Sequence, residues 1–458
     1  MDARVDPIVS TDDDRYPTLT EEGRCMLNRL REHPCAPRFH NESGNRLLAP
    51  EVEQVRVHEH SVLTAALSFA SNEQPPWRDT FVKACLRDVP YFRRRAAATS
   101  EVPPFHRLPT VDRGDLGRDI ADFVPDGIPT ARMINFRTSG TTGHPLLIAS
   151  LPVVAASYLG FHRRALRRFG VELQHGRGQV GVILLGYQKT CFTYVSVTPT
   201  QDEAGLAKIN LHPDDWRDPS DRAKYLAAMN PEVLAGDPLS FAVLLELLPS
   251  CRPRALFSTS MTLLPGLRRR LETHFGCPVL DLYSMNEAGP IAVFDPAVGG
   301  HVLLQPQMQV EILDSAGDAL PEGERGEITL TGGFNVCLPL LRYRTGDFAR
   351  LANIRGEPVL LDLEGRPPVR FRTTTGEWIN NIEVTHVLRP FPLSRFSLHQ
   401  DSSGALHFRY DGSGLDETSL RELLLRRFGN DQNISFHSLP PDPLKHIQYT
   451  SDLEGACP

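Results

Sequence analysis

The sequence predicts an α/β protein with a large N-terminal domain of parallel-sheet layers, a β-rich subdomain, and a small α+β C-terminal domain. The run at 179–185 is continuously apolar, as buried parallel strands are. Short apolar runs alternate with helical patterns as far as Tyr283, which favours α/β layers. From about residue 300 short strands are broken by turns, and a Gly-Arg-Pro-Pro segment then precedes the final part. The expected domains are therefore residues 1–364 and 366–458.

Length and composition restrict the class of protein. With 458 residues the chain exceeds a single typical core, so more than one domain is expected. The formal net charge of −7 argues against nucleic acid or an anionic membrane as a partner. No apolar run approaches the ~20 residues that span a bilayer, and the eight cysteines form no C-x-x-C pair. We expect a cytoplasmic protein without a disulfide framework.

Apolar periodicity and capping residues predict the remaining elements in chain order. Residues 1–18 are acidic and polar and are expected to be poorly ordered. Helices are expected after Thr20 and over 51–70, 78–97, 112–116, 152–169, 223–229, 240–248, 265–275 and 417–428. Strands are expected over 133–136, 146–149, 179–185, 232–236, 255–258, 279–283, 310–313, 326–330, 340–343, 397–399 and 406–410.

One glycine- and hydroxyl-rich stretch stands between two of these predicted strands. It consists of Thr138, Ser139, Gly140, Thr141, Thr142 and Gly143. Glycines permit close backbone approach to a ligand, and successive backbone N–H groups form an anion-binding nest. The pattern favours a polyphosphate ligand, and an ordinary surface turn is the alternative. No Lys-Ser or Lys-Thr follows, so this is not a Walker loop.

Two further motifs follow at strand ends. In the stretch 283–289, Glu287 directly follows a predicted strand, where a carboxylate beside a phosphate site suits Mg²⁺. In the stretch 341–347, Asp347 has the acidic side chain that can accept hydrogen bonds from ribose hydroxyls. Each motif alone is also compatible with an ordinary polar turn. Their occurrence together and in this order makes coincidence improbable.

The three motifs resemble those of the adenylate-forming enzymes, which include acyl-CoA ligases, adenylation domains of peptide synthetases and luciferases. The helical N-terminal region favours the phenylacetate-CoA ligase-like branch. The 341–347 motif matches without departure, whereas Ser284 and Asn286 replace a glycine and a threonine. His144 stands where that branch usually has lysine, and Pro368 stands at the expected pivot of the small domain. The resemblance implies that the small domain is a mobile lid.

The resemblance also implies roles for individual residues around ATP. Catalytic roles fall to Thr142, Glu287 and Lys445, the last being the only lysine of the C-terminal part, and Glu287 would also bind Mg²⁺. Nucleotide-binding roles fall to Thr138, Ser139, Gly140, Thr141, Gly143, Tyr283, Ser284, Asn286, Asp347 and Arg366. Within this set, Tyr283 would stack on adenine and Asp347 would bind the ribose. A solvated surface lysine is the alternative for Lys445.

Residues after two predicted strands are candidates for binding the acid. Tyr187 and Phe192 would suit a flat aryl acid, and Ser260 and Gly289 complete the expected acid-binding set. Such residues are as often part of an ordinary core.

The sequence thus predicts an AMP-forming ligase that activates a small-molecule carboxylic acid as an acyl-adenylate with release of pyrophosphate. Its cofactors would be ATP and Mg²⁺, and coenzyme A is the first choice of acyl acceptor. An amine or a carrier-protein thiol in specialised biosynthesis is the second choice. A non-catalytic nucleotide-binding relative is a further alternative, which His144 and Pro368 would favour.

Overall fold

The computed structural model describes most of the chain. It covers residues 11–67, 74–97, 103–137, 146–174, 176–187, 191–365, 369–380, 384, 387–388, 390–391, 393, 395–411, 415–439, 449–454 and 456. Across these ranges, no helix combines the length and the hydropathy that crossing a membrane requires.

The N-terminal part is mainly helical. Its elements are α1 (Asp12–Arg15), α2 (Glu21–Glu32), α3 (Ala49–Thr64), α4 (Arg78–Asp88), α5 (Pro90–Ala97), α6 (Arg113–Arg118) and the 3₁₀ helices η1 (Phe105–Arg107), η2 (Ile120–Phe123) and η3 (Thr130–Arg132). Thr20 caps α2, as its sequence position predicts. The helix expected over 78–97 is instead two helices, because Pro90 cannot continue α4 and starts α5.

The expectation of poor order up to residue 18 is wrong for the described residues from 11 onward. Thr11 caps α1 through a capping box with Asp14. Tyr16 is 1% exposed, and its hydroxyl donates to the Val195 carbonyl at 2.9 Å. One buried aromatic residue therefore anchors an acidic segment whose composition alone favours disorder.

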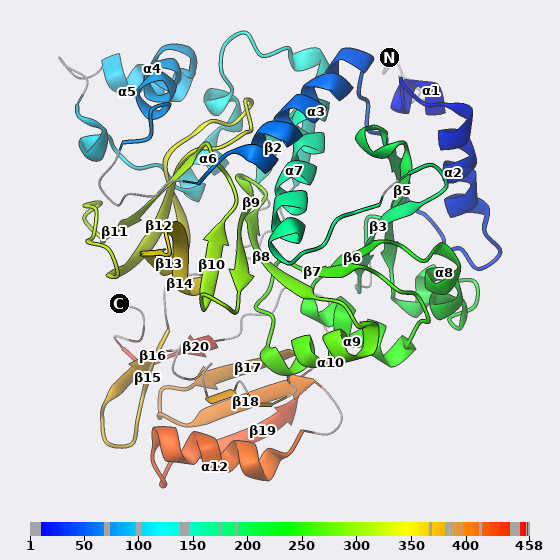
Figure 1. The fold of residues 1–458 in the computed structure, drawn as a ribbon. Coiled ribbons are helices and arrows are strands. Elements are labelled where there is room, and N and C mark those ends of the chain that lie inside the picture. The colour runs from blue at the N-terminus through cyan, green and yellow to red at the C-terminus, as the bar shows by residue number, and fades with distance from the viewer. Residues whose placement is uncertain are drawn as a thin grey trace, which may run out of the picture.

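A single twelve-stranded mixed sheet organises the chain up to Gly365 (Figure 1). Its strand order is β11-β12-β13-β14-β10-β9-β8-β7-β6-β3-β5-β4. The parallel half and its helices are α7 (Pro152–Arg168), β3 (Val180–Gly186), β4 (Tyr194–Thr198), η4 (Pro199–Gln201), β5 (Ala204–Asn210), η5 (Pro213–Asp215), α8 (Asp221–Met229), β6 (Val233–Gly236), α9 (Pro238–Leu247), β7 (Ala255–Ser258), α10 (Pro265–Phe275) and β8 (Val279–Met285). Only the edge strand β4 runs antiparallel within this half.

The antiparallel half continues directly from β8. It contains β9 (Gly289–Asp295), β10 (Gly300–Leu303), β11 (Met308–Leu313), β12 (Arg325–Gly332), β13 (Leu340–Ile354) and β14 (Glu357–Gly365). The predicted α/β class with a β-rich part is confirmed. The two halves form one sheet because β8 and β9 pair as a hairpin.

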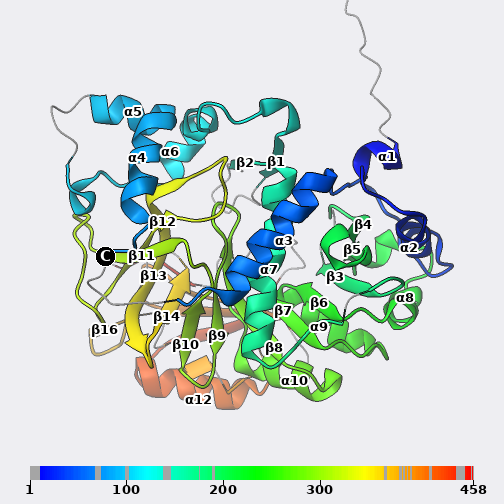
Figure 2. The same cartoon turned by 45° about the horizontal axis from the view of Figure 1, so that its top comes forward.

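Helices cover both faces of the parallel half. Apolar side chains of α2, α8, α9 and α10 pack on one face. Residues of α7, together with Val62 of α3, pack on the other face. Both views show α3 lying alongside α7 (Figures 1 and 2). This arrangement explains the uninterrupted apolar sequence of β3, since both faces of the strand are covered.

The C-terminal part has separate sheets and its own core. Its elements are β15 (Arg370–Arg372), β16 (Trp378–Asn380), β17 (Arg395–Gln400), β18 (Leu406–Asp411), α12 (Glu417–Phe428), β19 (Ile434–Ser438) and β20 (Tyr449–Ser451). β18, α12 and β19 form a βαβ unit, and α12 packs its apolar face on the four-stranded sheet. Leu264, just before α10, belongs to this core and joins it to the larger part. The boundary at 364–366 stays a prediction.

Candidate active site

The hairpin that carries the predicted phosphate-binding loop is formed by β1 (Ile134–Arg137) and β2 (Leu147–Ser150). These strands pair antiparallel, and Arg137 opposite Leu147 is the pair next to the loop. The loop residues Thr138, Ser139, Gly140, Thr141, Thr142, Gly143 and His144 lie outside the described residues, as do Arg366, Pro368 and Lys445. The structure therefore gives the strands on both sides of this loop.

One apolar core brings the three sequence motifs together. Leu146, directly after the loop, packs in the same buried cluster as Ala288 and Tyr343. Ala288 belongs to the motif at 283–289, and Tyr343 belongs to the motif at 341–347. Tyr283 packs against the same cluster and is partly buried. Segments up to about two hundred residues apart in sequence thus contribute side chains to one apolar cluster.

Glu287 lies in the tight turn between β8 and β9, where Met285 pairs with Gly289. Its side chain is only 3% exposed. Arg113 Nη1 donates to Glu287 Oε1 at 3.0 Å, and the Tyr343 hydroxyl donates to the same oxygen at 3.4 Å. A buried carboxylate is costly unless it is paired and hydrogen-bonded. These two partners satisfy that requirement.

Arg113 is a site residue that the sequence analysis did not identify. Its position is fixed by the backbone: Val111 forms a parallel bridge to Tyr343, and Arg344 N–H donates to the Val111 carbonyl at 2.7 Å. Asp112 then caps α6, so that Arg113 begins the helix beside β13. The sequence predicts the start of this helix, but a contact with Glu287 across 174 positions leaves no local pattern.

Asp347 lies on β13 and has a defined hydrogen-bond environment. The Tyr283 hydroxyl donates to Asp347 Oδ2 at 2.7 Å. Burial first, and the nearby Asp347 charge second, raise the pKa of Tyr283 well above its usual range, so the hydroxyl keeps its proton and donates. Asp347 N–H donates to Thr345 Oγ1 at 3.1 Å. Stacking of Tyr283 on adenine stays a prediction, whereas its contact with Asp347 is a structural feature.

The two arginines of the 341–347 motif have structural roles. Arg342 is 2% exposed, and its guanidinium donates to the carbonyls of His106 and Leu108, each at 2.7 Å. Arg344 Nε donates to Glu327 Oε2 at 2.6 Å. Glu327 Oε1 in turn accepts from Gly346 N–H at 2.9 Å. These contacts fix the strand that places Asp347.

Asp347 also pairs with Gly365 across β13 and β14. Gly365 is the first residue of the predicted linker, so this linker begins directly opposite Asp347, the expected ribose ligand. Arg325 on β12 pairs with Glu364 at 2.8 Å, and burial raises the pKa of Glu364 to about 7. The last described residues before the hinge are thus held by both ladder and side-chain contacts.

Three of the four predicted acid-binding residues, Tyr187, Phe192 and Ser260, are exposed. Tyr187, just after β3, is 37% exposed, and Phe192 is 52% exposed. Their rings lie near His212 (centroids 5.8 Å apart) and Tyr194 (5.6 Å), respectively. Ser260, after β7, is exposed and has a left-handed φ of 71°.

Gly289 has a different environment from the other three predicted acid-binding residues. Its φ is +71°, and a Cβ there would lie 2.6 Å from the Phe334 ring. The Tyr158 hydroxyl donates to the Asn286 carbonyl at 3.4 Å, and the Tyr158 and Phe334 rings meet edge to face at 5.1 Å. Asn286 itself is exposed, and Ser284 is partly buried within β8. The aromatic pair of Tyr158 and Phe334 is a second feature that the motifs do not reveal.

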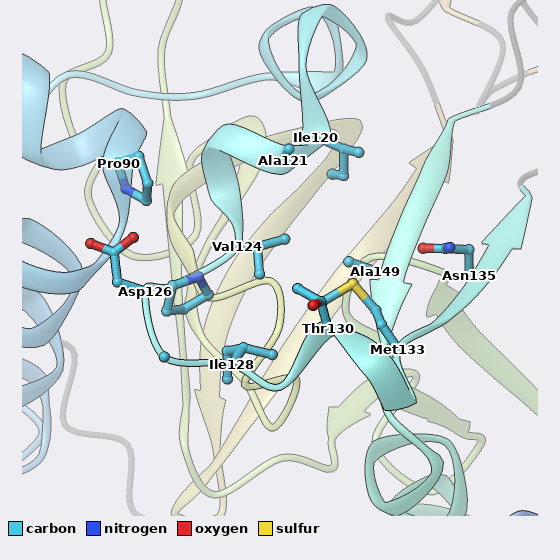
Figure 3. Close-up of a pocket in the computed structure, with 12 residues that line it drawn as sticks. Pro90, Ile120, Ala121, Val124, Asp126, Ile128, Thr130, Met133, Asn135 and Ala149 are labelled. Carbon is cyan, nitrogen blue, oxygen red and sulfur yellow. The ribbon is translucent and has the colours of Figure 1, made fainter.

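A hollow of about 380 Å³ lies beside the β1–β2 hairpin and contains none of the predicted site residues (Figure 3). Ile120, Ala121, residues 124–128 and Thr130 are among its lining residues on one side, and Asn135 and Ala149 of the hairpin line the other. Within the described ranges, three or more His, Cys, Asp or Glu side chains nowhere gather as a metal site. Mg²⁺ needs no such cage, because it binds through one or two carboxylates together with substrate phosphates. Glu287 fits that requirement.

Comparisons with known proteins agree with the motifs. A family model described as "AMP-binding enzyme" matches residues 204–337. A phenylacetate-coenzyme A ligase of Pseudomonas putida is 23% identical over 349 residues, covering 68% of this chain and 71% of that protein. The phenylacetate-coenzyme A ligase of Escherichia coli K12 is 22% identical over 299 residues, covering 59% of this chain and 64% of that protein.

Solved structures support the fold. A 2-hydroxyisobutyryl-CoA ligase in the postadenylation state, in complex with R3-HIB-AMP, has a TM-score of 0.61 at 16% identity. The alignment covers 84% of this chain and 95% of that one. The matched family model and the sequence relatives agree with the three motifs: this chain is similar to the adenylate-forming enzymes, and its sequence relatives are phenylacetate-coenzyme A ligases.

Proposed function

We propose that the protein is an AMP-forming acid–CoA ligase. It activates a carboxylic acid with ATP as an acyl-adenylate, releases pyrophosphate, and transfers the acyl group to coenzyme A. The observation that carries this proposal is the meeting of Leu146, Ala288 and Tyr343 in one core, which gathers three nucleotide-binding motifs at one place. The relatives named as phenylacetate-coenzyme A ligases support the same reaction class.

Asp347, Tyr283 and Glu287 are the described polar residues to which we assign roles in this reaction. Asp347, held by Tyr283, accepts hydrogen bonds from the ribose hydroxyls. Glu287 binds Mg²⁺ together with phosphate oxygens. Mg²⁺, when bound, neutralises charge that develops on the phosphates as pyrophosphate leaves. A buried site strengthens these interactions, because water competes less for the charges.

The remaining roles fall on residues outside the described ranges. The backbone N–H groups and hydroxyls of residues 138–143 bind the phosphates, with Thr142 contacting the reacting group. Lys445 stabilises charge that develops between the carboxylate of the acid and the α-phosphate. Arg366 binds the nucleotide from the hinge. These assignments rest on the motif resemblance.

The acid is proposed to bind among Tyr187, Phe192, Ser260 and Gly289, which favours an aryl or otherwise flat carboxylic acid. An amine or a carrier-protein thiol is the second candidate for the acceptor. The two prolines at the predicted hinge favour it, because fixed φ angles hinder the lid rotation that thioester formation requires.

The experiment is ATP–pyrophosphate exchange across a panel of aliphatic, arylacetic and benzoic acids. We expect exchange that depends on one class of acid, followed by thioester formation when coenzyme A is added. Acid-dependent exchange without thioester would favour an amine or carrier thiol as acceptor. ATP binding without exchange for any acid would indicate a non-catalytic relative. In Lys445→Ala, exchange should fall ~100-fold or more while transfer from preformed acyl-adenylate survives.

A further inference from the structure

The carboxylate proposed to bind Mg²⁺ already has a positively charged partner. Arg113 Nη1 lies 3.0 Å from Glu287 Oε1. The two side chains differ in exposure: that of Glu287 is 3% exposed, and that of Arg113 is 37% exposed. The guanidinium therefore lies on the solvent side of the pair, where an incoming ligand would meet it first.

The backbone that carries Arg113 is held in place by its neighbours. Val111 bridges to Tyr343, and Asp112 caps the helix that Arg113 begins. These contacts hold the main chain of 111–113 against β13. The long arginine side chain joins this fixed backbone to a charged head that lies at the protein surface, so a change of partner by the guanidinium would not require the backbone to move.

Elementary electrostatics opposes the presence of both cations on Glu287. A guanidinium and a divalent ion bound to one buried carboxylate repel each other strongly, because the local dielectric is low. Leaving the carboxylate unpaired is also costly. Glu287 therefore needs Arg113 when no metal is bound and must lose it when Mg²⁺ arrives. An arginine released beside a polyphosphate has an obvious new partner, since its planar fork matches phosphate oxygens.

We propose that Arg113 is an exchangeable counter-charge: it pairs with Glu287 in the empty site and binds the β- and γ-phosphate oxygens of ATP once Glu287 binds Mg²⁺. This inference rests on the proposed function and adds a phosphate ligand to it. After adenylation, the same guanidinium holds the pyrophosphate that leaves. Arg113 thereby couples metal binding to the presence of the triphosphate.

The exchange predicts opposite effects of one substitution on two ligands. Arg113→Gln removes the competitor for Glu287, so nucleotide-free protein should bind Mn²⁺, used as a probe for Mg²⁺, about tenfold more tightly. The same variant loses the phosphate ligand, so its affinity for pyrophosphate and for Mg·ATP should fall about 10- to 100-fold. Affinity for AMP, which lacks the β- and γ-phosphates, should stay unchanged. Electron paramagnetic resonance gives the free Mn²⁺, and calorimetry gives the nucleotide affinities.

Two further variants keep this test decisive. Arg118→Gln is the matched control, because Arg118 ends the same helix, pairs with Asp115 at 2.9 Å and is 78% exposed. It should change none of the three affinities. Arg113→Lys keeps the charge without the fork, so it should retain weak Mn²⁺ binding and lose part of the pyrophosphate affinity. If Arg113→Gln does not fold, Arg113→Lys takes its place in the binding measurements.

The outcomes separate this inference from the proposed function. If native protein binds Mg·ATP and both Arg113 variants bind Mn²⁺, pyrophosphate and AMP as the native protein does, Arg113 is only a structural partner of Glu287 and the exchange is wrong. Equal losses for AMP and pyrophosphate would also overturn it, since they indicate general damage to the site. Failure of native protein to bind Mg·ATP would instead contradict the proposed function.

Discussion

The nucleotide-binding end and the acid-binding end of the candidate site are held in different ways. At the first, Glu287 and Asp347 have partners on other elements, Arg113 and Tyr283, across 174 and 64 positions of sequence. At the second, Phe192 packs near Tyr194, two residues away, and more than half of its side chain is exposed. The buried Glu287 and the partly buried Asp347 at one end are thus held by long-range pairs, whereas Tyr187 and Phe192 at the other end are exposed.

This difference indicates a division of tasks. Groups that bind a constant ligand such as ATP gain from preorganisation, because side chains already fixed in position lose no further conformational entropy when the ligand binds. Groups that contact a variable acid need shape and apolar area more than fixed charge. Substitutions at the two ends should therefore differ in the kind of defect as well as in its size.

The largest effect is expected for Asp347→Ala. It removes a charged acceptor from two ribose hydroxyls and should lower kcat/KM for ATP in pyrophosphate exchange by about 100-fold or more. Tyr283→Phe is the matched control, since it deletes the hydroxyl, with its 2.7 Å hydrogen bond to Asp347 and its 3.8 Å contact with Met285 Sδ, and keeps the ring. It should cost about tenfold.

Two results would break the comparison at this end. Unchanged ATP dependence in Asp347→Ala would remove Asp347 from the nucleotide site. A Tyr283→Phe defect as large as that of Asp347→Ala would mean that Asp347 acts only when Tyr283 positions it. Thermal melting of both variants shows whether the fold is intact.

An intermediate effect, on stability, is expected at the boundary between the two ends. Asp281 on β8 pairs in register with Ser258, the last residue of β7 before the acid-side loop. Burial raises the pKa of Asp281 from 3.8 to about 7, partly opposed by the charge of Arg268. The unfolded chain therefore loses this proton near pH 4, and the folded chain keeps it until about pH 7.

The sign of the pH dependence follows from this raised pKa. Between pH 4 and 7 the folded state binds more protons than the unfolded state, so the contribution of Asp281 to stability falls as pH rises. Asp281→Asn stays neutral and should gain in melting temperature relative to native protein across this window. Asp431→Asn, at an exposed position, is the control, and its melting temperature should change with pH as that of native protein does. If the melting temperature of Asp281→Asn also changes with pH as that of native protein does, the Asp281 carboxyl is ionised in the folded state.

The sequence predicts the elements well where one physical signal dominates. β3 is recognised from its continuous apolar run, because both of its faces are covered and so both sets of side chains are apolar. α2 is recognised from its capping threonine. The continuity of the sheet was not predicted, because the residue pattern within each strand does not reveal that β8 and β9 pair as a hairpin. α1 was missed since a single buried residue, Tyr16, outweighs an acidic composition.

In the candidate site, sequence motifs identify the residues expected to contact the ligand. They do not identify the residues that hold those side chains in position. Glu287 and Asp347 stand in recognisable local patterns. Arg113 has no such pattern, because its role depends on a strand bridge between Val111 and Tyr343. Arg342 sits within a motif, but its contacts with the His106 and Leu108 carbonyls give it a structural role. Local sequence encodes chemistry more directly than it encodes these distant supports.

The smallest effect is expected at the acid-binding end, and it tests the comparison most sharply. Phe192→Ala removes a ring whose side chain is 52% exposed, so the free energy of unfolding should change by no more than about 0.5 kcal/mol. If the ring contacts the acid, the preference between an arylacetic acid and a short aliphatic acid should shift by about tenfold. The ATP dependence of exchange should stay as in native protein. Val57→Ala, at a position 63% exposed on α3, is the control that should alter neither property. A loss of all exchange in Phe192→Ala, with the fold intact, would show that this ring is as essential as Asp347 and would end the proposed division between the two ends.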